Sequence, residues 1–160
     1  MISSLDGTPR RLYTAKQMGD ACEMLVAAEL TLAGIPAMKV PDNWPCYDVI
    51  AQPADGGTPQ RVSVKSRTFK RGSDTFVYYD VKDEFDWLAI VLLPGADLTR
   101  RRIFVVPRHI ADARARKDKP TSKDADSRYW PQEKIAEVLG DFEGNFSLSS
   151  TGTKPEVAQP

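Results

Sequence analysis

The run FDWLAIVLL, residues 85–93, restricts the fold of this chain more than any other segment. A short and almost continuous apolar run of this kind predicts a strand that is buried on both faces. The elements predicted around it follow the order helix, strands, helices. This order favours an α/β or α+β domain, in which one mixed sheet of about five strands is flanked by helices.

A long helix is predicted before the strands. Thr14 and Gln17 have the spacing of a capping box, and the next twenty or so residues contain no proline. We expect a helix over residues 15–32 that Gly34 closes. Its apolar residues cover more than one narrow stripe, so the helix is expected to pack on two sides.

The remaining elements are read from alternation and turn residues. The glycine- and proline-rich turn PADGGTP separates two strands that we expect to form a hairpin. The strands are expected at residues 36–40, 47–52, 60–67, 75–81, 85–93 and 101–107, and later helices at 107–117 and 132–139. The charged segment 117–128 is expected to be mobile. We expect residues 1–149 to form a single domain and residues 150–160 to form a disordered tail.

Composition excludes several classes of protein. The chain has 22 basic and 22 acidic residues, so any surface that attracts anions must be local. It has neither a run long enough to span a membrane nor a signal-peptide core, and a cytoplasmic location is expected. Cys22 and Cys46 are then expected to be reduced. Together with the single histidine, His109, they do not make a zinc-binding pattern.

The segment QRVSVKSR, residues 60–67, combines strand alternation with charge. Its period of two predicts a strand with one apolar face and one polar face. The first face carries Val62, Val64 and Ser66, and the second carries Arg61, Ser63, Lys65 and Arg67. So much charge on one side of a central strand suggests a binding or catalytic surface, although a lone lysine there is more often only solvated.

Two acidic residues are expected to meet Lys65. Glu23 shares a helix face with inward-facing apolar residues, and a carboxylate on a packed face needs a partner. Asp48 opens the strand that pairs with the strand of Lys65 in the hairpin. Two carboxylates and a lysine that converge at a sheet edge make a site for a divalent metal ion and a phosphate.

The segments GDACE, YDVI and VSVKSR, in this order, resemble the PD-(D/E)xK nuclease superfamily. The resemblance is strong over residues 16–70, and its nearest branches are the archaeal Holliday-junction resolvases and the small group I intron homing endonucleases. It implies a restriction-endonuclease-like core. It also implies an endonuclease that uses Mg²⁺ or Mn²⁺ to hydrolyse DNA, with branched or otherwise structured DNA as a candidate substrate.

The resemblance assigns roles to individual residues. Glu23, Asp48 and Lys65 match the helix acid, the strand aspartate and the motif lysine, and Ser63 stands where the family usually has a second strand acid. The expected metal ligands are Glu23, Asp48 and the main-chain carbonyl of Val64. Lys65 would orient the attacking water and stabilise charge on the phosphate. A serine at position 63 leaves the site one negative charge short.

The expected partner is DNA, whose phosphates Arg67, Lys70 and Arg71 would bind. A homodimer or larger homo-oligomer is expected, because cutting both strands with one site per chain usually requires two chains. Ser63 leaves a second interpretation open, in which the fold binds nucleic acid or a protein partner without catalysis. A third is a protein-interaction domain whose charged face is only surface.

Three other features have two interpretations each. The run from Arg100 to Arg102 could contact nucleic acid, but a solvated loop is favoured. Trp44 could stack on a base or pack against the edge of the sheet. His109 is expected to be a surface residue rather than a general base.

Overall fold

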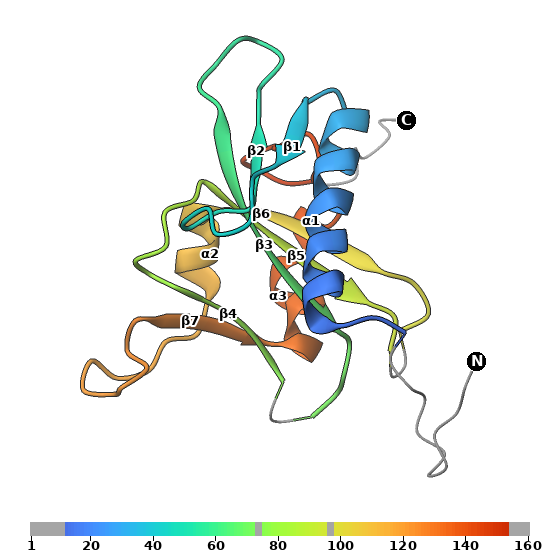
Figure 1. Ribbon diagram of the computed structural model, residues 1–160. Helices are drawn as coiled ribbons and strands as arrows, with labels where there is room; N and C mark the ends of the chain where they lie inside the picture. Colours follow the sequence, from blue (N-terminus) through green and yellow to red (C-terminus); the bar gives the residue numbers. More distant parts are fainter. Residues whose placement is uncertain (1–11, 73–74, 96–97, 154–160) are drawn as a thin grey trace, which may run out of the picture.

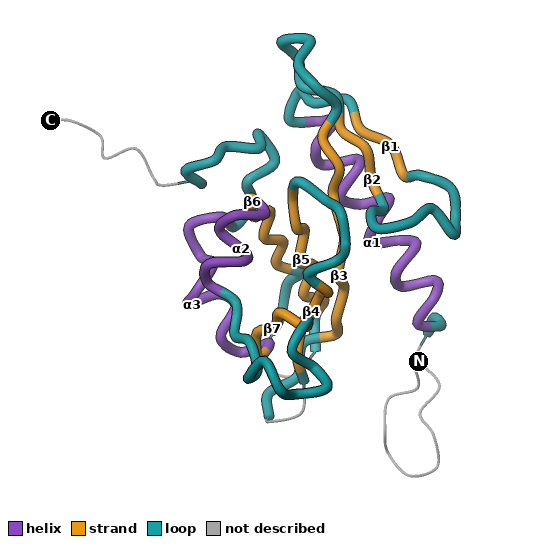
Figure 2. Tube along the Cα trace, turned by 90° about the vertical axis from the view of Figure 1, so that its left-hand side faces the viewer, coloured by secondary structure: helices purple, strands orange, loops and turns teal. Residues whose placement is uncertain are grey.

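The computed structural model describes residues 12–72, 75–95 and 98–153. The chain forms three layers. Helix α1, Ala15–Leu32, covers one face of a five-stranded sheet, and a two-stranded sheet and two short helices cover the other face (Figures 1 and 2). No helix in the described part of the chain is long and apolar enough to cross a membrane.

Helix α1 begins and ends where the sequence predicts. The Thr14 side chain accepts a hydrogen bond from the Gln17 N–H, and the Gln17 side chain accepts one from the Thr14 N–H, which completes the capping box. After the helix, Gly34 has a φ of 99°. Glycine adopts this left-handed conformation without a steric cost, so the chain can turn there into the first strand.

The five-stranded sheet has the order β1-β2-β3-β5-β6. Its strands are β1 Ala37–Lys39, β2 Val49–Ala51, β3 Gln60–Thr68, β5 Trp87–Leu93 and β6 Arg102–Pro107. The β3–β5 pair is parallel and the other three pairs are antiparallel, so the sheet is mixed as predicted. The predicted β2–β3 hairpin is confirmed, with Val49 opposite Val62.

Two hydrophobic cores lie on the two faces of this sheet. Ala89 and Val91 of β5 join the core beneath α1, whereas Leu88 and Ile90 join the core on the opposite face. All four side chains are fully buried. The predicted burial of this strand on both faces is therefore confirmed, and β5 holds the layers together through apolar contact.

The mixed sheet of five strands is as predicted, but the strand predicted at residues 75–81 lies outside it. Strand β4, Phe76–Asp80, pairs instead with β7, Ser127–Pro131, and forms a second, antiparallel sheet. Strand β7 includes Ser127 and Arg128, the end of the segment 117–128. Trp130 explains why β7 pairs with β4. Its side chain is 1 % exposed and packs in the second core beside Val77 and Tyr79 of β4.

The remaining elements follow the strands. They are α2 Arg108–Arg114, the 3₁₀ helix η1 Gln132–Lys134, α3 Ile135–Leu139 and the 3₁₀ helix η2 Gly140–Phe142. The helix predicted at 132–139 thus begins as a 3₁₀ turn. After η2, the Thr153 N–H donates to the Asp141 carbonyl at 2.7 Å. Most of the tail predicted at 150–160, from residue 154 onward, lies outside the described residues.

Candidate active site

Asp48 lies directly before β2 and bonds to β3 through both its main chain and its side chain. Its N–H donates to the Val62 carbonyl at 3.0 Å, and its Oδ2 accepts a hydrogen bond from the Val64 N–H at 2.7 Å. Val64 lies beyond the last β2–β3 pair, which joins Val49 and Val62. The carboxylate therefore takes the place of a missing strand partner and is fixed against β3.

Ser63 and Lys65 lie on either side of this hydrogen bond. Val62 and Val64 belong to the core beneath α1, so the alternation of β3 directs Ser63 and Lys65 to the opposite face. The Val64 N–H that bonds to Asp48 lies between these two residues in the chain, but the residues that line a hollow with Asp48 come from α1, β1 and the loop before β2. Lys65 is half-buried, whereas Ser63 is only 2 % exposed.

Glu23 reaches the same region from α1. It lines, with Asp48, a hollow of about 330 Å³ at the end of β2. Burial raises the pKa of the Glu23 carboxyl, and the negative charge of Asp48 raises it further, although Lys39 acts in the opposite direction. The two carboxylates are therefore close enough for their negative charges to repel each other.

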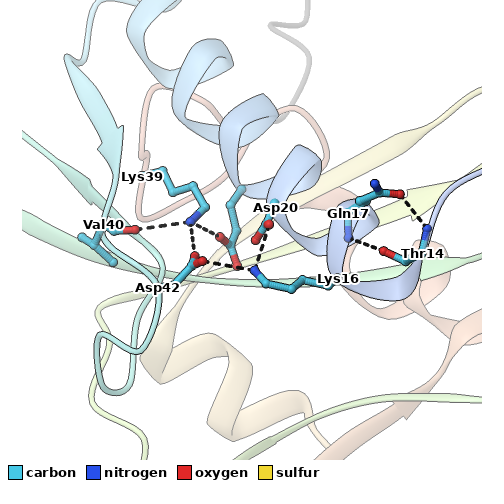
Figure 3. A network of polar contacts seen from close by, with 8 residues as sticks. Thr14, Lys16, Gln17, Asp20, Lys39, Val40 and Asp42 are labelled. Atoms are coloured by element: carbon cyan, nitrogen blue, oxygen red, sulfur yellow. Dashed lines mark hydrogen bonds and ion pairs between the residues drawn. The ribbon is translucent and has the colours of Figure 1, made fainter.

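Lys39, the last residue of β1, neutralises part of this charge. Its Nζ lies 3.3 Å from Glu23 Oε2 and 2.9 Å from Asp42 Oδ1. Lys16 in turn bonds to Asp42 at 3.1 Å and to Asp20 at 3.0 Å, which gives a chain of alternating charges along α1 (Figure 3). Sequence reasoning missed Lys39. Only the Lys16–Asp20 pair carries a signal in the sequence, because its spacing of four residues is that of a helix pair.

The loop between β1 and β2 forms a wall of the hollow. Trp44 and Tyr47 both line it, and their rings meet edge to face with centroids 6.2 Å apart. Trp44 is 49 % exposed, which leaves much of its ring open to a ligand. Asn43 and Cys46 have φ angles of 67° and 73°. Left-handed residues other than glycine carry some strain, as is common in loops at functional sites.

The donor set suits a hard divalent cation. Glu23 and Asp48 offer carboxylate oxygens, and the C=O of Val64 points to the same edge of β3 as its N–H, toward Asp48. Mg²⁺ is often held by one or two carboxylates together with substrate phosphates and water. Within the described residues, no group of three or more His, Cys, Asp or Glu side chains could hold a metal ion.

The basic residues proposed to bind DNA follow Lys65 along the chain. Arg67 lies on the same face of β3 and is anchored to β4, because its Nε donates to the Phe76 carbonyl at 3.3 Å. Lys70 and Arg71 are exposed after the end of β3, and the Arg71 guanidinium lies 5.8 Å from the centroid of the Phe69 ring.

Other polar residues of the sequence lie elsewhere. Arg102 forms two hydrogen bonds to the Glu143 carboxylate, at 2.6 and 3.1 Å, whereas Arg100 and Arg101 are exposed. His109 is exposed at the start of α2. Both cysteines are free thiols, and of the two only Cys22 is buried.

Comparison with known proteins identifies the fold. No protein-family model matches the sequence, and no curated protein matches it. The bacterial homing endonuclease I-Ssp6803I superposes with a TM-score of 0.53 at 16 % identity, over 86 % of this chain and 91 % of that one. Archaeoglobus fulgidus Hjc, a Holliday junction resolvase, superposes with a TM-score of 0.44 at 17 % identity, over 73 % and 90 %. The likeness to the homing endonuclease confirms the predicted restriction-endonuclease-like fold.

Proposed function

We propose that this protein is a divalent-metal-dependent endonuclease that hydrolyses phosphodiester bonds of DNA. The observation that carries the proposal is the position of Asp48. Its carboxylate is held at 2.7 Å by the Val64 N–H, between Ser63 and Lys65, and it shares a hollow with Glu23. A fold in common with a homing endonuclease supports the same function.

Each side chain then has a role that suits its position. Asp48, Glu23 and the Val64 carbonyl would hold Mg²⁺ or Mn²⁺, which when bound polarises the phosphate and makes its water more acidic. Lys65 follows the anchored amide directly, so its ammonium group can orient the attacking water and stabilise negative charge on the phosphate. The hydrogen bond from Val64 keeps the Asp48 carboxylate in one orientation throughout.

DNA binding is proposed for the basic residues beyond the site. Arg67, Lys70 and Arg71 lie within five residues of the chain and would contact phosphates, which positions the DNA without reading its sequence. One site per chain cuts one strand at a time. Cleavage of both strands would therefore require a homodimer or larger homo-oligomer.

Ser63 favours a second candidate function, a protein that keeps the fold and binds nucleic acid or a protein partner without cleaving DNA. Its side chain is neutral and 2 % exposed, so it adds no charge to the site. The two functions differ in one respect. A nuclease needs the divalent cation between Glu23 and Asp48, and a binding protein does not.

Cleavage assays separate the candidates. Plasmid, single-stranded and four-way-junction DNA would be incubated with the protein in Mg²⁺, in Mn²⁺ or in EDTA. A nuclease cleaves at least one substrate with the metal ions and none in EDTA. Lys65→Ala should abolish cleavage, whereas Lys123→Ala, at an exposed lysine of another loop, serves as the matched control. Absence of cleavage in every condition would favour the binding protein.

A further inference from the structure

The second sheet exposes aromatic side chains on its outer face. Tyr78 is 55 % exposed and Phe76 is 36 % exposed, while Val77 and Tyr79 between and beyond them are buried. Tyr129 of β7 lies opposite Tyr78, and its ring meets that of Phe76 edge to face at 5.4 Å. These three residues, Phe76, Tyr78 and Tyr129, form what we call the aromatic face. The pairing of β4 with β7 fixes the spacing of its residues.

A cation lies at one edge of the aromatic face. The Arg67 guanidinium is 5.5 Å from the centroid of the Tyr78 ring and bonds to the Phe76 carbonyl. Arg67, Thr75, Phe76, Tyr78 and Gln132 line a hollow of about 330 Å³ there. Arg67 is half-buried and also donates to the Ser66 carbonyl, which fixes its guanidinium beside the rings. A fixed arginine beside exposed rings is a combination that binds single-stranded nucleic acid, since the cation holds a phosphate and the rings stack on bases.

The opposite edge of the aromatic face is acidic. Asp118 and Asp124 line a second hollow of about 290 Å³ beside the rings, and Asp118 accepts a hydrogen bond from the Tyr129 hydroxyl at 2.8 Å. Carboxylates there repel phosphates. A DNA backbone on this surface is therefore confined to the Arg67 edge, and its bases extend over the rings.

The aromatic face also lies close to the candidate active site. Arg67 and Lys65 are two residues apart on the same face of β3, which corresponds to about 7 Å along the strand. A DNA strand whose phosphate lies at Lys65 can thus continue to Arg67 and place its next bases against Tyr78.

We propose that the aromatic face binds unpaired bases of the DNA substrate, so that the enzyme acts next to a single-stranded segment. The proposal rests on the proposed nuclease function for its link to cleavage, but the binding it describes does not require chemistry. Bases that are paired in a duplex are stacked on their neighbours and cannot lie on the rings. The class of substrate is therefore forked or otherwise partly single-stranded DNA.

The test measures binding in EDTA, where cleavage cannot interfere. The affinities of a forked duplex with oligothymidine arms and of a fully paired duplex would be measured by fluorescence anisotropy. Tyr78→Ala should weaken binding of the fork about tenfold and leave binding of the paired duplex unchanged. Tyr78→Phe should retain the affinity. Tyr13→Ala, at a tyrosine 41 % exposed before α1, is the matched control and should also retain it.

A fork with abasic arms separates stacking from charge. It keeps every phosphate but has no bases to stack, so we expect it to bind wild type as weakly as the normal fork binds Tyr78→Ala. Equal binding of the normal and abasic forks, or an equal loss by Tyr78→Ala on fork and duplex, would overturn the proposal. So would sedimentation data in which Tyr78→Ala dissociates an oligomer without any change in fork binding. Absence of cleavage beside Tyr78-dependent fork binding would remove only the nuclease function.

Discussion

Asp48 and Asp86 occupy comparable places on the two sides of β3, and they differ in how their charge is neutralised. Each directly precedes a strand that pairs with β3, and each accepts a hydrogen bond from a β3 amide, Val64 at 2.7 Å and Arg61 at 2.8 Å. Asp86 also receives the Arg61 guanidinium, with its Nε and Nη2 at 3.2 and 3.1 Å. Asp48 lies instead beside a second carboxylate, Glu23.

The pKa shifts record this difference. Burial alone raises the pKa of the Asp86 carboxyl, but the hydrogen bonds from the Arg61 side chain and main chain outweigh it, and the pKa is lowered overall. The pKa of Glu23 is raised, by burial and then by Asp48. A carboxylate with its own arginine needs no further cation. Glu23 shares its one lysine, Lys39, with Asp42, and Asp48 lines the same hollow, so this end of β2 keeps a negative charge that an external cation can neutralise.

The largest expected effect is a difference in the rate of DNA cleavage between variants of Asp48 and Asp86. Asp48→Asn keeps an oxygen for the Val64 N–H but removes the charge that would hold the metal ion. We expect it to lower the rate of DNA cleavage at least about a hundredfold, the size of effect seen when one key electrostatic group of an active site is removed. Asp86→Asn should leave the rate within about twofold, because a surface change away from the reacting atoms has little effect on them.

Single-turnover cleavage rates at saturating Mg²⁺ measure this contrast. Both substitutions replace an aspartate whose carboxylate accepts a hydrogen bond from a main-chain N–H of β3, so each is the matched control for the other. Equal losses of activity in the two variants would show that the role of Asp48 is structural. Circular dichroism of both proteins would verify that they are folded.

The second prediction reverses the order of the two aspartates for stability. Asp86→Asn should lower the free energy of unfolding by about 1 kcal/mol at pH 7, a value reduced because the pair is about one-third exposed. The lowered pKa gives the sign of the pH dependence. The stability that the charged Asp86 contributes is present above the ordinary pKa of aspartate, about 3.9, and is lost as the pH falls through the lower pKa of the folded protein.

Urea unfolding at pH 7, 4 and 3 would test this prediction. The difference between wild type and Asp86→Asn should decrease from the first pH to the last. Asp48→Asn should not be destabilised at pH 7, because it relieves the repulsion with Glu23 while it keeps the Val64 hydrogen bond. A larger loss of stability in Asp48→Asn than in Asp86→Asn would contradict the comparison.

Local patterns in the sequence predict much of this fold. The capping box of α1, the turn between β2 and β3 and the apolar run of β5 each depend on neighbours within a few residues, and all three are observed. Glu23 lies on the predicted helix and Asp48 at the start of a predicted strand, so both are candidates from the sequence. Their common hollow could be anticipated because a helix face and a strand end fix where each side chain begins.

Other features depend on contacts between residues far apart in the sequence. Strand β4 has the alternation of any half-buried strand, and only its pairing with β7, about fifty residues later, excludes it from the main sheet. The Lys39–Glu23 ion pair has the same origin, since it joins β1 to α1. The burial of Ser63 also depends on a distant layer, because Ser63 faces the side of the sheet where β4 and β7 pack. No spacing in the sequence encodes these contacts.

The smallest expected effect concerns Glu23 and the cation that its charge attracts. Its raised pKa means that the folded protein binds this proton more tightly than the unfolded chain does. The resulting stability is present below the ordinary pKa of glutamate, about 4.3, and is lost as the pH rises through the raised value. Glu23→Gln should therefore be more stable than wild type at pH 7, by less than about 1 kcal/mol, and the difference should disappear near pH 4.

Added Mg²⁺ should reverse this order at pH 7. The ion stabilises wild type in proportion to how tightly the two carboxylates bind it, whereas Glu23→Gln has lost one of them. Thermal unfolding with and without millimolar Mg²⁺ measures both effects, and Glu133→Gln, at an exposed glutamate of η1, controls for the general loss of a negative charge. If Mg²⁺ raised the melting temperatures of wild type and Glu23→Gln equally, Glu23 would not be a ligand. The negative charge of Glu23 would then be neutralised by Lys39 alone.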